Sequence, residues 1–124
     1  MASPDDIREV VNHYVKLMNA GDSDAIADLY TGDATLEDPV GSEPLAGRAA
    51  IRDFYAAAAG AVVLELSGPV RVCGHEAAFP MLATVGAGER RSCLDIIDLM
   101  TFDEDAQIRS MRAFWSPDRM RPAG

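Results

Sequence analysis

The sequence predicts an α+β fold in which N-terminal helices pack on one face of a curved, mostly antiparallel sheet. Up to Gly60 apolar residues recur at helical spacing, and beyond it the chain changes to short β-branched runs separated by turn residues. Helices that precede the strands, instead of alternating with them, favour α+β over α/β. With 124 residues and 48% hydrophobic content, the chain is expected to form a single domain over residues 1–124.

The first helix is predicted between Ser3 and Gly21. Ser3 offers a capping hydroxyl, Pro4 suits the first helical position, and two aspartates follow where backbone amides are free. From Ile7 onward apolar residues recur at steps of three and four, and Tyr14 falls within this stripe. Tyr14 is therefore expected to face the core.

A second, short helix is predicted to begin at a cap supplied by Asp22 or Ser23. Its apolar residues place Tyr30 on the inner face, and Gly32-Asp33 is typical of a turn that ends a helix. Tyr30 is therefore expected to reach the core from a helix.

A short strand is predicted over Ala34–Asp38, where period-two alternation places Asp38 on the apolar side. Pro39 and the residues after it are expected to form a loop. A third helix is then predicted over Gly47–Gly60, with Tyr55 on its inner face and an alanine run that favours helix.

Five further strands are predicted to follow as a meandering sheet, with glycine-rich or acidic turns between them. Gly68-Pro69 is expected to interrupt or bulge its strand. The five segments are Ala61–Leu66, Val70–Cys73, Ala77–Val85, Arg90–Phe102 and Gln107–Trp115.

Composition argues against several classes of function. Twenty acidic against eleven basic residues give a formal charge of -9, which repels nucleic acid and anionic membranes, so partners are expected to be neutral or cationic.

No apolar run is long enough to span a membrane and the N-terminus lacks a secretory pattern, so a cytoplasmic location is expected. Cys73 and Cys93 lack metal or redox spacing, so they are expected to be small buried residues, and no metal or cofactor is expected.

Asp98 is a first candidate for chemistry, because the strand around it is apolar on both sides. Alternation places it on the same face as Ile96 and Met100. Desolvation there is expected to raise the pKa of Asp98 and to keep the carboxyl protonated, as a hydrogen-bond donor. The alternative, an acid that faces water, fits Asp95 better, because that residue has polar neighbours.

Asp38 and Tyr14 are the other candidates. A base, a phenol and a second acid in apolar surroundings are what a cofactor-free enzyme needs to move a proton next to a carbonyl. Tyr30 and Tyr55 also lie on predicted inner faces, so the three hydroxyls either join in one chain of hydrogen bonds or belong to independent core residues. Taken alone, Asp38 before Pro39 fits a turn-forming aspartate better than a base.

The segment Leu36–Pro44, with Ala49–Tyr55 after it, resembles the bacterial Δ5-3-ketosteroid isomerases of the nuclear-transport-factor-2-like superfamily. The resemblance implies a conical fold in which a curled sheet encloses a deep apolar pocket, in a homodimer formed through the exposed face of the sheet. The tail Ser116–Gly124 matches no part of the family's pattern. Other similar segments are Tyr14-Val15, Asn19–Asp22, Ile96–Asp98 and Ser110–Phe114.

The resemblance also implies roles for individual residues. Asp38 would be the general base, and Tyr14 and Asp98 would form an oxyanion hole. Tyr30 and Tyr55 would support Tyr14 from behind. Apolar pocket residues are implied as well, although plain core packing explains them nearly as well: Trp115, Phe79 and Met81.

The implied reaction converts a 3-oxo-Δ5-steroid to the 3-oxo-Δ4 form through a dienolate, by proton transfer from C4 to C6 without cofactor or metal. The alternative is a non-catalytic or polyketide-cyclase-like pocket protein, because the superfamily also includes dehydratases, epoxide hydrolases and cyclases. Dehydratase or hydrolase chemistry would require further polar groups. His13 and His75 are poor candidates for this, since both are expected to face solvent.

Overall fold

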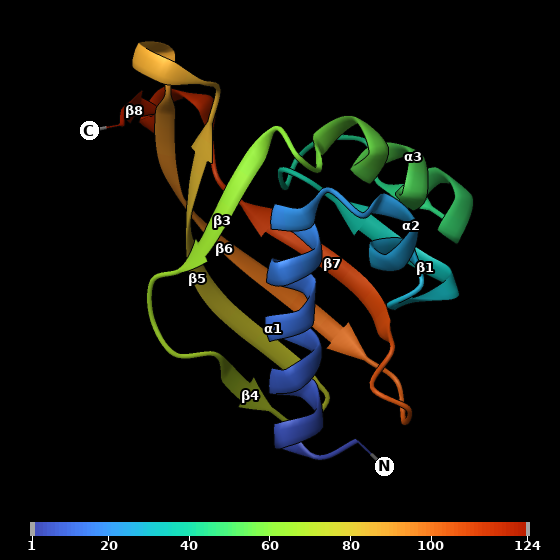
Figure 1. Cartoon of the computed structure of the whole chain (residues 1–124). Coiled ribbons are helices and arrows are strands. Elements are labelled where there is room, and N and C mark those ends of the chain that lie inside the picture. Colours follow the sequence, from blue (N-terminus) through green and yellow to red (C-terminus); the bar gives the residue numbers. More distant parts are fainter. Residues whose placement is uncertain (1, 124) are drawn as a thin grey trace.

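The computed structural model describes residues 2–123 and has helices packed on one mixed, curled sheet, so the predicted α+β architecture is confirmed (Figure 1). Two short 3-10 turns, η1 (Gly88–Arg90) and η2 (Pro117–Arg119), precede β6 and β8. The α-helices are α1 (Pro4–Ala20), α2 (Ser23–Ala27) and α3 (Arg48–Ala58). The strands are β1 (Tyr30–Glu37), β2 (Leu45–Ala46), β3 (Val62–Leu66), β4 (Arg71–Cys73), β5 (Glu76–Val85), β6 (Ser92–Phe102), β7 (Ile108–Phe114) and β8 (Arg121–Pro122).

The sheet has the order β2-β1-β7-β6-β5-β3, with β4 paired to β5 and β8 paired to β6. These pairings are antiparallel except for the parallel pair of β1 and β7. Figure 1 shows α1 running across one face of the sheet, while α2 and α3 cover the region near β1. We call the face under the helices the inner face and the opposite one the outer face.

Helix α1 is fixed at both ends. The Ser3 hydroxyl accepts a bond from the Asp6 amide (3.1 Å), and the Asp6 carboxylate accepts one from the Ser3 amide (3.0 Å), which is a capping box. Gly21 ends the helix with φ 73°, a conformation that favours glycine. The Asn19 side chain exchanges two hydrogen bonds with the backbone of Leu64 (2.9 and 2.8 Å), which hold the helix end against β3.

The predicted helical position of Tyr30 is wrong. Helix α2 ends at Ala27, and Tyr30 is the first residue of β1. The parallel pairing with β7 overrides the local helical spacing, because the Ile108 amide donates to the Leu29 carbonyl (2.8 Å) where the two strands meet. Gly32-Asp33 therefore lies within the strand and forms no turn. Tyr30 is nevertheless fully buried, as predicted.

Strand β6 has two different faces. Asp98, Met100 and Phe102 are buried on the inner face, so the predicted alternation around Asp98 is confirmed. On the outer face Ile97 is 51% exposed and pairs across the strands with Phe114, which is 43% exposed. The same strand thus presents an apolar interior and a partly apolar surface.

The remaining predictions about turns, cysteines and histidines have mixed outcomes. Gly68-Pro69 separates β3 from β4, as expected of a break. Cys93 is buried, but the prediction of a buried Cys73 is wrong, because that residue ends the short edge strand β4 and is exposed. His13 and His75 are exposed, as predicted. The short strands β2 and β8 were not expected.

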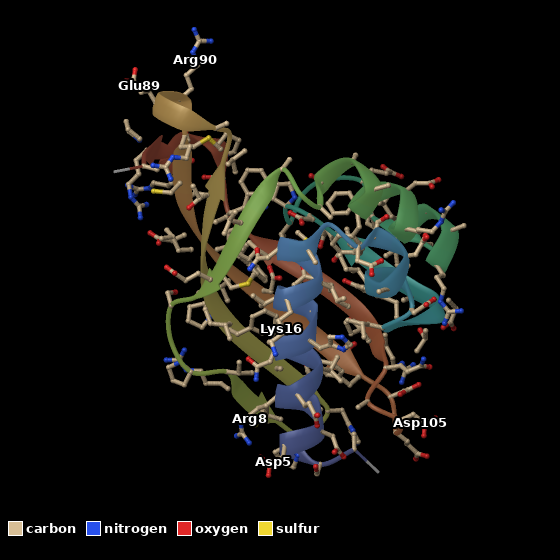
Figure 2. All side chains as sticks on the ribbon, in the orientation of Figure 1. Asp5, Arg8, Lys16, Glu89, Arg90 and Asp105 are labelled. Atoms are coloured by element: carbon tan, nitrogen blue, oxygen red, sulfur yellow. The ribbon has the colours of Figure 1, made fainter. Side chains whose placement is uncertain are left out.

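Several charged side chains near the ends of the molecule lie at the surface. In Figure 2 the labelled side chains of Asp5, Arg8, Glu89 and Arg90 project away from the ribbon, and all four residues are exposed. No helix within residues 2–123 is long and apolar enough to cross a membrane.

Candidate active site

A cavity of about 310 Å³ lies against the inner face of the sheet, within the size range of small-molecule sites. Its polar groups come from Tyr14, Tyr55, Asp38, Asp98 and Trp115, and the other lining side chains in the described part of the chain are apolar. These apolar lining residues are Met18, Phe54, Ala58, Val62, Leu64, Met81, Ala83, Val85, Leu94, Ile96, Ala113 and Met120.

Asp98 is a buried acid that faces this cavity from the middle of β6. It is 2% exposed, and its neighbours on the adjacent strands are Phe79 of β5 and Ala113 of β7. Burial raises the pKa of Asp98 well above its ordinary value, and the negative charge of Asp38 raises that pKa further. The protonated form, which can donate a hydrogen bond, is therefore favoured.

Asp38 lies one residue beyond β1, on a loop that is tied to β7. The Val40 amide donates to the Ala113 carbonyl (2.8 Å). The Glu37 carboxylate accepts a bond from Arg112 Nε (3.0 Å), which joins the end of β1 to β7 a second time. These contacts position the half-buried Asp38 carboxyl in the wall of the cavity.

Trp115 provides a polar contact that the sequence analysis missed. Its indole Nε1 donates a hydrogen bond to Asp38 Oδ1 at 2.6 Å, across 77 residues of sequence. Burial raises the pKa of Asp38, and this hydrogen bond lowers it, because the bond favours the carboxylate. A buried tryptophan usually finds a partner for its N–H, but sequence spacing does not say which partner.

The three tyrosine hydroxyls form one chain of hydrogen bonds, the first of the two alternatives left open above. Tyr30 and Tyr55 are joined at 2.6 Å, and the Tyr55 hydroxyl donates to that of Tyr14 at 3.4 Å. Since Tyr55 has only one proton, Tyr30 must donate to Tyr55, and the proton of Tyr14 is left free. Burial raises the pKa of each phenol, so all three stay neutral.

The implied pocket residues separate into two groups. Met81 and Trp115 line the cavity. Phe79 does not belong to the lining: it is fully buried in the core, directly opposite Asp98 on β5. The sequence analysis did not find Met120, which lines the cavity from the tail that lies outside the resemblance. Within residues 2–123, no three His, Cys, Asp or Glu side chains are placed to hold a metal ion.

Comparisons with known proteins agree with this geometry. The model of the SnoaL-like domain family matches residues 11–111. A steroid Delta-isomerase from Nocardioides simplex is 49% identical over 116 residues, which cover 93% of this chain and 94% of that protein. The epoxide hydrolase LasB from Streptomyces lasalocidi is 34% identical over 114 residues, which cover 87% of this chain but 40% of that protein.

A solved structure shares the fold. SalBIII, an epoxide hydrolase/cyclase-like enzyme of pyran ring formation in the polyether salinomycin, matches with a TM-score of 0.90 and 31% identity, over 99% of this chain and 100% of that chain. The family model covers most of the sequence, and the isomerase aligns over nearly the full length of both proteins. The chain therefore belongs to the SnoaL-like domain family, with the nuclear-transport-factor-2-like fold, and the resemblance to the ketosteroid isomerases is confirmed.

Proposed function

We propose that this protein is a steroid Delta-isomerase that converts 3-oxo-Δ5-steroids to 3-oxo-Δ4-steroids. The observation that carries the proposal is one apolar cavity with a half-buried carboxylate, Asp38, and two neutral donors, Tyr14 and Asp98. The 49% identity with a steroid Delta-isomerase, over 93% of the chain, supports the same reaction.

Asp38 acts as the only base in this proposal. Its carboxylate removes a proton from C4, which breaks the C4–H bond and leaves a dienolate over C3, C4, C5 and C6. The same carboxyl then returns the proton to C6, so the double bond moves from C5–C6 to C4–C5 and the C3 ketone is restored. The reaction only relocates a proton, and therefore needs no cofactor or metal.

Tyr14 and Asp98 stabilise the negative charge that develops on the C3 oxygen. Each donates one hydrogen bond, and one such donor contributes about 2.7 to 4 kcal/mol to lowering the barrier. The chain from Tyr30 through Tyr55 supports Tyr14, because each hydroxyl polarises the next and leaves the Tyr14 proton free for the ligand.

Asp38 and Asp98 have different surroundings, which suit them to different roles. Asp98 is buried among apolar groups and beside the charge of Asp38, so it retains its proton. Asp38 is less buried and accepts a bond from Trp115, which favours its ionised form. One carboxyl is thus available as a base while the other serves as a donor.

The cavity suits a flat, neutral, apolar ligand. Most of its lining is hydrophobic, and its few polar groups suffice to orient a single carbonyl. The net charge of -9 neither attracts nor repels such a substrate.

Turnover of 5-androstene-3,17-dione tests the proposal directly. The absorbance of the conjugated enone is expected to grow over many turnovers with the parent protein. Asp38→Asn is expected to lower turnover by at least about 10² to 10⁴, because the general base is lost. Asp95→Asn, on the outer face, is the matched control and should remain active. The absence of enone formation by the parent, or parental turnover in Asp38→Asn, would contradict the proposal.

We also propose that the protein forms a homodimer through the outer face and that it works in the cytoplasm. The exposed side chains of Val63, Ile97 and Phe114 support the dimer, because association would bury apolar surface. Sedimentation at micromolar concentration should give a species of twice 13.3 kDa, and Ile97→Lys should shift it towards the monomer. A parent protein that sediments only as a 13.3 kDa species would exclude the dimer.

A second candidate is epoxide opening, favoured by the likeness to SalBIII and LasB. In that reaction Asp38 would take a proton from a water that attacks the epoxide carbon, and Asp98 would protonate the oxygen as the C–O bond breaks, but the described cavity lining lacks the further polar groups that hydrolase chemistry would require. Hydrolysis of an aryl-alkyl epoxide, without enone formation from the ketosteroid, would favour this candidate.

A further inference from the structure

The C-terminal segment 116–123 has no role in the chemistry described above, yet it follows a defined path. After Trp115 the chain forms the turn η2 and then the short strand β8 beside β6. Figure 1 shows β8 at the same end of the sheet as the turn between β5 and β6. We call residues 116–123 the strap.

Three sets of contacts attach the strap to β6 and the turn before it. Strand β8 pairs with β6 through Cys93 and Arg121 in antiparallel register. The Ala123 amide donates to the Arg91 carbonyl (3.0 Å), and the Arg121 guanidinium donates to the Asp95 carboxylate (3.2 Å). The strap is therefore held at β8 and at the residue that follows it, by backbone bonds and one ion pair.

Met120 is the strap residue that reaches the cavity. It lines the cavity although it is 42% exposed, so one side faces the ligand space and the other faces solvent. Continuing the register of β8 by one residue places Met120 opposite Leu94, another lining residue. Leu94 lies four residues from Asp98, which is about 13 Å along the strand at about 3.3 Å per residue.

We propose that Met120 is a specificity-determining residue that contacts the end of the ligand furthest from Asp38 and Asp98. This inference rests on the proposed isomerase function and extends it to the D-ring and its C17 substituent. A steroid nucleus with its C3 oxygen at Asp98 extends over a comparable span and reaches Met120 at the mouth of the cavity.

The chemistry of this end of the cavity predicts what it selects. Met120, Leu94 and Val85 are apolar and offer no side-chain hydrogen bond to a C17 substituent. A methionine side chain is flexible and adapts to different shapes. The mouth is therefore expected to discriminate by size and apolar character, with little preference between a C17 ketone and an alkyl group of equal bulk.

Two substitutions test the inference, assayed with 5-androstene-3,17-dione and with the longer 5-pregnene-3,20-dione. Met120→Trp is expected to lower kcat/KM for the longer substrate by about tenfold relative to the shorter one, because it narrows the mouth. Met120→Ala should shift the ratio towards the longer substrate. The change should appear in KM, since the reacting atoms lie at the other end. Arg119→Ala, a strap residue outside the cavity lining, is the matched control.

A binding measurement separates this inference from the proposed function. The chain has one tryptophan, Trp115, and it lines the cavity, so its fluorescence reports ligand binding without turnover. Met120→Ala keeps Trp115 as its one tryptophan, so titration of this variant with 4-androstene-3,17-dione and progesterone should show the same shift in relative Kd towards the longer ligand. If isomerisation fails but this change is present, the proposed reaction is wrong and the role of Met120 stands. If the parent isomerises but the Met120 variants change neither the ratio of kcat/KM between the two substrates nor the ratio of Kd between the two ligands, the role of Met120 is wrong. If no steroid binds, both fail.

Discussion

The two faces of β6 place the same residue type in opposite environments. Asp98 on the inner face is 2% exposed, among Phe79, Met100 and Ala113. Asp95, three residues earlier on the outer face, has a side chain that is 76% exposed and forms an ion pair with Arg121 at 3.2 Å. One strand thus carries one buried acid and one solvated acid.

The difference shows that burial, and not residue type, determines what a carboxyl does in this fold. On the inner face desolvation raises the pKa of Asp98 and favours a neutral donor. On the outer face water and Arg121 surround the carboxylate of Asp95, and exposed ion pairs of this kind contribute little to stability. Helices that cover only one face of the sheet therefore create the site.

Substitution of the two aspartates should have very different effects on turnover. Asp98→Leu removes the proposed donor to the developing oxyanion and is expected to lower kcat by about 10² to 10³. Asp98→Asn retains a weaker neutral donor, so turnover should fall but no further than in the leucine variant. Asp95→Asn and Asp95→Leu should stay within about twofold of the parent, because surface changes away from such sites have small effects.

Steady-state kinetics at neutral pH distinguish the possible outcomes. Faster turnover in Asp98→Asn than in the parent would mean that Asp98 is ionised and opposes the dienolate. Unchanged turnover in both Asp98 variants would exclude a role in the oxyanion hole. The effect is expected in kcat more than in KM, since the oxyanion gains more from the bond than the ground-state ketone does.

The sequence predicts the inner face of β6 well, because period-two alternation in a long apolar strand places Asp98 on the same face as Ile96 and Met100. The same kind of local pattern fails for Tyr30, where a helical spacing of apolar residues is overridden by pairing of β1 with β7. Local spacing describes neighbours along the chain, and cannot show which distant strand will compete for a segment.

Contacts between distant segments were beyond prediction for a related reason. The hydrogen bond from Trp115 to Asp38 joins residues 77 positions apart, and the hydrogen bonds between Asn19 and Leu64 join residues 45 positions apart. Met120 was missed because a short, polar tail carries no periodic signal, although β8 anchors it beside the cavity. The roles expected of Asp38, Tyr14 and Asp98 came from the family resemblance, since Asp38 taken alone fits a turn-forming aspartate better, and the mutual orientation of these groups depends on the closed fold.

The bond from Trp115 sharpens the comparison, because it acts on the pKa of Asp38, the proposed base. This bond lowers the pKa of Asp38, so Trp115→Phe is expected to raise that pKa. With Asp38 as the base, kcat/KM is expected to rise with pH as this carboxyl ionises, and the acidic limb of the profile should move to higher pH in the variant. Activity should fall on that limb and recover at higher pH. An unshifted limb, or one controlled by a histidine, would contradict the assignment of Asp38 as base.

The protonation of Asp98 should also affect the stability of the fold, by less than it affects turnover. Because the pKa of Asp98 is raised in the folded state, the fold loses stability as pH rises from about 4, where the unfolded carboxyl ionises, towards the folded pKa. Asp98→Asn removes this loss, so its Tm relative to the parent should increase between acidic and neutral pH.

Thermal melts over that pH range measure the effect, and a gain of ~1 kcal/mol corresponds to about 4 °C for a chain of this size. Asp95→Asn, a substitution on the exposed outer face, is the control. A Tm difference between Asp98→Asn and the parent that stays constant over this pH range would mean that Asp98 binds protons equally in the folded and unfolded states.

Direct titration of the carboxyl groups by carbon-13 NMR tests most closely the claim that the inner face keeps Asp98 neutral. The resonances are assigned in the ligand-free protein by their loss in Asp98→Asn and Asp95→Asn. At neutral pH the Asp98 resonance is predicted to have the chemical shift of a protonated acid. Exposed aspartates, in contrast, ionise near pH ~4. An Asp98 resonance that titrates in that ordinary range would contradict the account.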